Sequence, residues 1–117
     1  MALKTKKDRL RAWVRALRSG KYRQGKGQLK RGNNYCCLGV ASEVYARETE
    51  KEWNTGGFLL DCAVMKWFGL DSENPIICEI SASSLNDGDD DGDIPRHSFK
   101  QIANLIEKHF KLKPATA

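Results

Sequence analysis

The side chains in this sequence that could do chemistry are mostly cations, and they are concentrated at its amino-terminal end. Residues 1–31 hold twelve Lys and Arg against one acid, Asp8, a charge of about +11, whereas the remaining residues hold eight cations against fourteen acids, about −6. A cluster of charge of one sign attracts and steers ions of the opposite sign. The pattern therefore favours a binding protein with an anionic partner over an enzyme.

The cations are spaced in a way that suggests a binding face. Those of residues 7–18 recur every three or four positions, so on a helix they form a stripe opposite the apolar one. Residues 21–31 add glycines whose backbone can approach a phosphate, together with Tyr22, which could stack on a base. The predicted anion-binding residues are Lys7, Arg11, Arg15, Arg18, Lys21, Tyr22, Arg23, Gln24, Lys26, Lys30 and Arg31. The alternative is a solvated face without a ligand.

An acidic segment near the other end of the chain matches part of a calcium loop. From Asp87 it reads D-x-D-x-D-G-x-I, the first eight positions of an EF-hand, but Ser98 stands where the EF-hand has its bidentate Glu. Any calcium site would be weak, and no cofactor is required. The candidate ligands are Asp87, Asp89, Asp91 and Asp93. The alternatives are a flexible acidic turn before a helix and a turn that pairs with the basic first helix.

The cysteines and histidines provide a further hypothesis. The four cysteines lack C-x-x-C spacing and have apolar neighbours, so we expect them to pack as small apolar side chains. In the alternative, Cys36 or Cys37 is a nucleophile and His97 or His109 its base, which requires the pair to lie within hydrogen-bonding distance. Nothing in the spacing brings such a pair together, and we therefore expect no enzymatic activity.

Size and composition predict one domain over residues 1–117. The chain is 40% hydrophobic and 30% charged, which suits a globular fold with a modest core. Its longest apolar run is far shorter than the roughly 20 residues of a membrane helix, and its charged start does not resemble a secretory signal. We expect a cytoplasmic protein that does not enter a membrane.

Local patterns predict an α+β fold with about four helices and a short β-hairpin or small antiparallel sheet. The predicted helices cover residues 6–19, 38–48, 60–68 and 98–110. Ser98 and Gln101 form a capping box at the start of the last helix. Glycine and asparagine at 32–34 predict a hairpin turn between strands at 27–30 and 35–37, and residues 75–80 are expected to be extended. Residues 112–117 are expected to form a flexible tail.

Four segments of the sequence form a recognisable set. They are W-x-x-A-L-R-S-G-x-Y-x-Q-x-x-G from Trp13, Y-C-C-L-G-V from Tyr35, L-N-D from Leu85 and S-F-x-x-I-A-x-x-I-E from Ser98. Together they resemble a family of small uncharacterised proteins encoded by tailed bacteriophages. Most of these residues have an expected role in a helix, a helix cap or the core. Packing accounts least for the presence of Tyr22, Gln24 and Gly27.

The resemblance implies life in an infected bacterium and carries no known activity. It is consistent with a binding protein that uses its basic face to hold a nucleic acid or nucleotide and thereby counters host defence. The alternative is an inhibitor of a host enzyme or defence complex that binds through exposed aromatics such as Tyr22, Trp53 or Phe58. An acidic host protein is also a candidate partner, and self-association is open.

Overall fold

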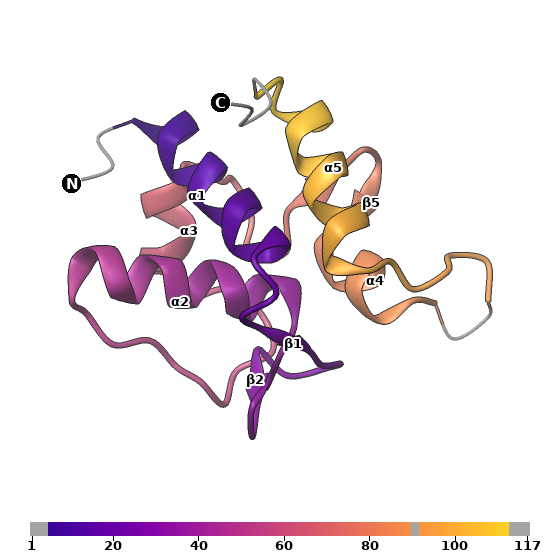
Figure 1. Cartoon of the computed structure of the whole chain (residues 1–117), viewed down its shortest axis with the longest axis horizontal. Helices are drawn as coiled ribbons and strands as arrows, with labels where there is room; N and C mark the ends of the chain where they lie inside the picture. The colour runs from indigo at the N-terminus through magenta and orange to yellow at the C-terminus, as the bar shows by residue number, and fades with distance from the viewer. Residues whose placement is uncertain (1–4, 90–91, 113–117) are drawn as a thin grey trace.

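The two clearest apolar stripes of the sequence pack against each other in the structure, a computed structural model that describes residues 5–89 and 92–112 (Figure 1). They belong to α1 (Lys6–Arg18) and α5 (Phe99–His109). Their buried residues are Leu10, Trp13, Val14 and Leu17 in α1, and Phe99, Ile102, Ala103 and Ile106 in α5. The predicted capping box of Ser98 and Gln101 is present and fixes the start of α5.

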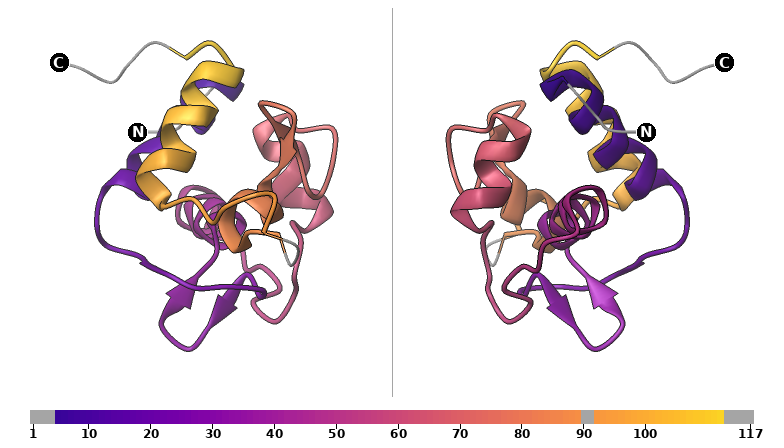
Figure 2. Two further views of the ribbon diagram at one scale, coloured as in Figure 1. Left: turned by 90° about the vertical axis from the view of Figure 1, so that its right-hand side faces the viewer. Right: turned by 90° about the vertical axis from the view of Figure 1, so that its left-hand side faces the viewer.

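Helix α2 (Cys37–Thr49) lies at the centre of the molecule. Figure 2 views it along its axis, between α1 and α5 on one side and α3 (Cys62–Phe68) on the other. The fully buried Trp13 joins these elements, because its Nε1 donates to the Cys37 carbonyl at 2.9 Å and its ring lies 5.7 Å from that of Phe68. The buried apolar side chains form one cluster.

The first sheet differs from the predicted hairpin. It contains β1 (Arg23–Gln24), β2 (Lys30–Arg31) and β3 (Asn34–Tyr35), in the order β1-β3-β2. The turn forms at the predicted place, but the strands are shorter and shifted because Cys36 already caps α2. Strand β1 pairs with β3 in parallel, so the sheet is mixed and not purely antiparallel.

A second hairpin and an additional helix follow α3. Strands β4 (Ile76–Ile77) and β5 (Ile80–Ser81) pair across a turn in which Cys78 and Glu79 both have positive φ angles. The next helix, α4 (Ala82–Asp87), was not predicted and brings the described helices to five. The α+β fold class is confirmed.

The junction between the basic segment and α2 depends on Gly39. The Leu29 carbonyl accepts a hydrogen bond from the Cys36 amide at 3.1 Å and lies against the first turn of α2. A Cβ atom at Gly39 would lie 1.8 Å from that oxygen. Glycine is therefore required here for the chain that precedes β2 to approach the helix.

The end of α5 extends the core beyond the predicted boundary. Leu112, which was expected to begin the flexible tail, is buried and donates its amide to the Glu107 carbonyl at 2.9 Å. The rest of that tail, residues 113–117, lies outside the described residues. None of the helices in the described part of the chain has the length and apolar character that a membrane crossing requires.

Candidate anion-binding pocket

A pocket with a volume of about 230 Å³ lies between α1 and α2. Each helix contributes residues three or four positions apart, and the two residues that follow the turn after α1 complete the wall. The lining consists of Ala12, Arg15 and Ala16 from α1, its C-cap residue Ser19, then Lys21 and Tyr22, and Val44, Arg47 and Glu48 from α2. We call this site the α1–α2 pocket.

Cations dominate the charge of the α1–α2 pocket. Arg15, Lys21 and Arg47 are exposed, and the structure of residues 5–89 and 92–112 gives none of the three an ion pair. Glu48 is the single acid in the lining. The apolar part of the lining comes from small side chains and from the buried Val44, which leaves room for a ligand beneath the charges.

Tyr22 forms a half-buried wall of the pocket. Its ring packs edge-to-face against that of Tyr35, with centroids 5.1 Å apart. Burial raises the pKa of the Tyr22 hydroxyl, although the positive charge of Arg47 opposes this effect. The hydroxyl is therefore protonated at neutral pH and can donate a hydrogen bond.

The eleven predicted anion-binding residues do not form one site. Arg15, Lys21 and Tyr22 line the α1–α2 pocket. Exposed cations elsewhere are Lys7 on α1 and Arg23, Lys26 and Arg31 on or beside the mixed sheet. Lys30 lies over the ring of Tyr35, with its Nζ 5.4 Å from the centroid. The remaining three, Arg11, Arg18 and Gln24, form hydrogen bonds within the protein.

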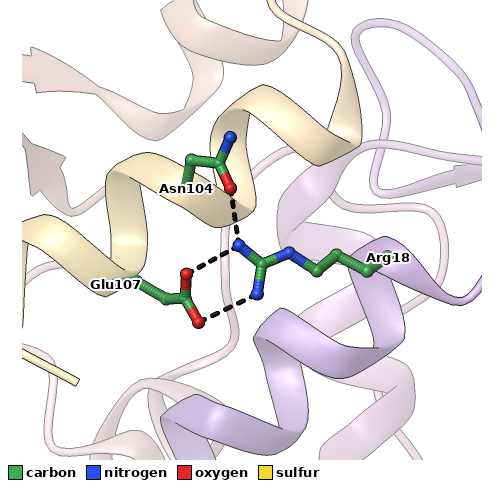
Figure 3. Close-up of polar contacts among 3 residues, drawn as sticks. All are labelled: Arg18, Asn104 and Glu107. Atoms are coloured by element: carbon green, nitrogen blue, oxygen red, sulfur yellow. Dashed lines mark hydrogen bonds and ion pairs between the residues drawn. The ribbon is translucent and has the colours of Figure 1, made fainter. Parts of the chain in front are cut away.

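Arg18 joins α1 to α5. Its guanidinium forms a bidentate pair with Glu107, at 2.6 and 2.8 Å, and also donates to Asn104 (Figure 3). The hydrogen bonds between the pair raise the pKa of Arg18 and lower that of Glu107. A second predicted cation, Arg11, pairs with Asp8 one turn away at 2.9 Å. Both guanidinium groups thus have acidic partners inside the molecule.

Gln24 belongs to a polar network around the fully buried Asn86. The Gln24 amide donates to the Asn86 Oδ1 at 3.0 Å and to the His97 carbonyl at 2.8 Å. The Asn86 Oδ1 also accepts from the Cys37 amide, and its Nδ2 donates to the Gly25 carbonyl at 2.9 Å. These bonds hold β1, α2 and α4 together, which gives both Gln24 and the L-N-D segment a structural role.

The Gly27 amide already has an anionic partner. It lies 3.2 Å from each oxygen of the Asp87 carboxylate, so the acidic segment contacts the glycine-rich part of the basic one. Of the three motif residues that packing was expected to explain least, Gln24 and Gly27 therefore have hydrogen-bond partners within the protein. Tyr22 differs from them because it lines the α1–α2 pocket.

The predicted calcium ligands are only partly described. Asp87, Asp89 and Asp93 lie in the described chain, and Asp91 falls outside it. No group of three metal-ligating side chains occurs within the described residues. The Asp89 amide donates to the Ile94 carbonyl at 2.9 Å. Calcium binding stays a prediction.

The candidate nucleophiles have structural partners. The Cys36 sulfur caps α2 by accepting from the Gly39 amide, and the buried Cys37 thiol donates to the Ala82 carbonyl at 3.5 Å. Burial raises the pKa of both thiols, which disfavours the reactive thiolate.

The candidate bases also have partners of their own. The Nδ1 atom of His109 accepts from the Cys78 amide at 3.0 Å, and that of His97 lies 2.8 Å from the Pro95 carbonyl. Neither imidazole is hydrogen-bonded to Cys36 or Cys37 in the described structure.

Both charged residues that α2 contributes to the pocket were missed by the sequence analysis. Arg47 and Glu48 lie one turn beyond Val44 on α2, at the end of the helix predicted over residues 38–48. Their spacing from the apolar Val44 was visible in the sequence. Nothing there indicated that this face of α2 meets the basic face of α1.

The fold and the site define a small α+β protein with a cationic pocket between two helices. The chain belongs to the family described as a domain of unknown function, DUF8296, which matches residues 5–110 and therefore includes the whole pocket lining. Comparison of the chain with curated protein sequences and with solved structures found no match.

Proposed function

We propose that this protein is a non-enzymatic binding protein whose α1–α2 pocket holds a phosphate group of a nucleotide or nucleic acid. The observation that carries the proposal is the convergence of Arg15, Lys21 and Arg47 around one small pocket, without ion pairs in the described structure. Two guanidinium groups can each form paired hydrogen bonds with phosphate oxygens, and the ammonium adds a third charge.

A nucleic acid and a single nucleotide differ in whether they would contact the cationic surface outside the pocket. Arg23, Lys26 and Arg31 are exposed on or beside the mixed sheet, whose first strand begins directly after the pocket residue Tyr22. A nucleic acid strand would use these cations together with the pocket, and its affinity would fall steeply with salt. A single nucleotide would need the pocket residues alone.

The first test is purification at low salt, with absorbance and mass spectrometry to identify any copurifying anion. Binding is then measured by calorimetry with ribonucleoside monophosphates and by fluorescence anisotropy with a labelled single-stranded oligonucleotide. We expect Arg15→Glu/Lys21→Glu to weaken binding by about tenfold or more, because a repulsive charge replaces each contact.

The matched control reverses two exposed lysines outside the pocket, Lys66→Glu/Lys100→Glu. It makes the same change in net charge and should retain most of the affinity. Equal losses in both variants would show that only net charge matters, and the pocket assignment would then be wrong. A third variant, Arg23→Glu/Arg31→Glu, reverses cations beside the mixed sheet. If its affinity falls as much as that of the pocket variant, the ligand is a strand of nucleic acid.

The biological setting is part of the proposal. The sequence segments that resemble a tailed-bacteriophage family support an origin in such a phage and a cytoplasmic location in the infected bacterium. A protein that sequesters a nucleotide or nucleic acid there would counter host defence. Expression in defended and undefended bacteria before phage challenge tests this role, and the Arg15→Glu/Lys21→Glu variant should lose any protection of the phage.

A second candidate function is inhibition of a host protein. It is favoured by the loop before α3, where the side chains of Phe58 and Leu59 are 64% and 39% exposed. The other two aromatics proposed for this role are partly covered, since Trp53 donates to Glu43 and Tyr22 lines the pocket. Recovery of one host protein at high salt after nuclease treatment, and its loss with Phe58→Ala, would support this function over the first.

A further inference from the structure

The carboxylate of Glu48 is not expected in a pocket that binds only phosphate. It is exposed, lies next to Arg47 on α2 and lines the same pocket as the three cations. It forms no ion pair with any of them in the described structure. An ionised carboxylate accepts hydrogen bonds and repels a phosphate, so its position predicts a second kind of group on the ligand.

We propose that Glu48 selects a phosphorylated ligand that carries hydrogen-bond donors beside its phosphate, namely a single nucleotide. This inference rests on the proposed function and names its ligand class. In it, Arg15, Lys21 and Arg47 hold the phosphate, and Glu48 accepts from donors of the sugar or base. The two adjacent hydroxyls of ribose and the N1–H and N2–H edge of guanine each offer the pair of donors that a carboxylate matches.

The dimensions and wall of the pocket agree with this ligand class. Its volume of about 230 Å³ is below the range of about 300–1,000 Å³ common for ligand pockets, so it suits one phosphate and part of a ring. Tyr22 provides an aromatic wall with a neutral hydroxyl. An aromatic ring of this kind stacks on any nucleobase or packs against a sugar.

The test compares Glu48→Gln with the unaltered protein by calorimetry at one low salt concentration. The probes are inorganic phosphate, ribose 5-phosphate, the four ribonucleoside 5′-monophosphates and their 2′-deoxy counterparts. Glu52→Gln is the matched control, because Glu52 is also exposed, follows α2 and does not line the pocket.

We expect Glu48→Gln to change the affinities for the two kinds of probe in opposite directions. Removal of the negative charge should tighten inorganic phosphate about twofold, and loss of a charged acceptor should weaken the selected nucleotide about tenfold. Glu52→Gln should do neither. Discrimination against the 2′-deoxy probes would identify the ribose as the donor, and discrimination for guanine would identify the base.

Two results would overturn the inference and can be told apart. If Glu48→Gln tightens phosphate and every nucleotide alike, or changes neither, the proposed anion pocket stands and Glu48 has no selective role. If the unaltered protein binds none of the probes, while a folded state is confirmed by circular dichroism, the pocket proposal fails together with this one.

Discussion

Arg18 illustrates how a charged side chain can be read as a ligand contact from the sequence and have a structural role in the fold. It lies on the basic stripe of α1, yet its guanidinium pairs with Glu107 on α5, 89 positions away. Lys21 and Tyr22 follow only a few residues later. The pair therefore holds the end of α1 against α5, just before the segment that contributes Lys21 and Tyr22 to the pocket wall.

The pair predicts a pH-dependent contribution to stability. Hydrogen bonds from Arg18 lower the pKa of Glu107 in the folded protein, so its contribution is complete above the ordinary pKa of a glutamate, about 4.3, and is lost as pH falls through the lowered value. We expect Glu107→Gln to reduce the free energy of unfolding by about 1 kcal/mol at pH 7, because the pair is bidentate but partly exposed.

Urea denaturation of both proteins between pH 7 and pH 2 measures this difference. The gap between them should narrow only below the ordinary glutamate pKa. A gap that stays constant to pH 2, or that widens toward acid, would contradict the assigned role of the pair. Glu52→Gln serves as the control for a general change in charge.

At the scale of elements, the approach of the Leu29 carbonyl to the first turn of α2 sets where the basic segment lies. Cys36 caps the helix, Gly39 leaves space for the carbonyl, and Asn86 holds the Cys37 amide from the other side. These contacts fix the position of the three-stranded sheet relative to α2. The pocket depends on them because one of its walls lies on α2 and another, at Tyr22, adjoins β1.

This junction predicts different costs for two glycine substitutions. Gly39→Ala places a Cβ atom 1.8 Å from the Leu29 oxygen, so we expect a loss of about 3 kcal/mol or more of unfolding free energy. Gly32→Ala meets no atom within 4 Å and pays only for its positive φ angle, about 1 kcal/mol. Chemical denaturation measures both, and equal losses would contradict the close approach.

At the scale of the whole molecule, one apolar cluster includes residues from all five helices, while charge is distributed unevenly over the chain. The basic residues 1–31 and the acidic remainder meet at Arg18 with Glu107 and at Gly27 with Asp87. The cations of the α1–α2 pocket are left out of these internal pairings. A ligand that binds there would add to the stability of the native state by mass action.

The rates at which the four cysteines react with a thiol reagent measure how often the core of the molecule opens. Cys62 is exposed and Cys78 is half-buried, whereas Cys36 and Cys37 are buried with pKa values raised by burial. We expect a thiol reagent to modify Cys62 rapidly in the native protein and to reach Cys36 and Cys37 only when the core opens. Time-resolved labelling with peptide mass spectrometry measures this, and rapid modification of Cys37 would contradict the described core.

Features set by neighbouring residues were predictable from the sequence. The apolar stripes of α1 and α5, the capping box at Ser98 and the turn after β2 depend on spacing within a few residues, and each formed where expected. The short helix α4 was missed because its six residues span fewer than two turns and give little periodicity. The basic character of the pocket wall was also visible, through Arg15 and Lys21.

The tertiary structure alone decided which of the charges remain available to a ligand. Arg18 and Glu107, Gln24 and Asn86, and Gly27 and Asp87 pair across more than half of the chain, and no local pattern specifies such partners. Arg47 and Glu48 became pocket residues only when the core brought α2 against α1. By itself the sequence determined α1, α2, α3 and α5 and the basic character of the amino-terminal segment. Burial of their apolar stripes in one core determined which charged faces meet, because that packing fixes the helix positions and the polar side chains follow.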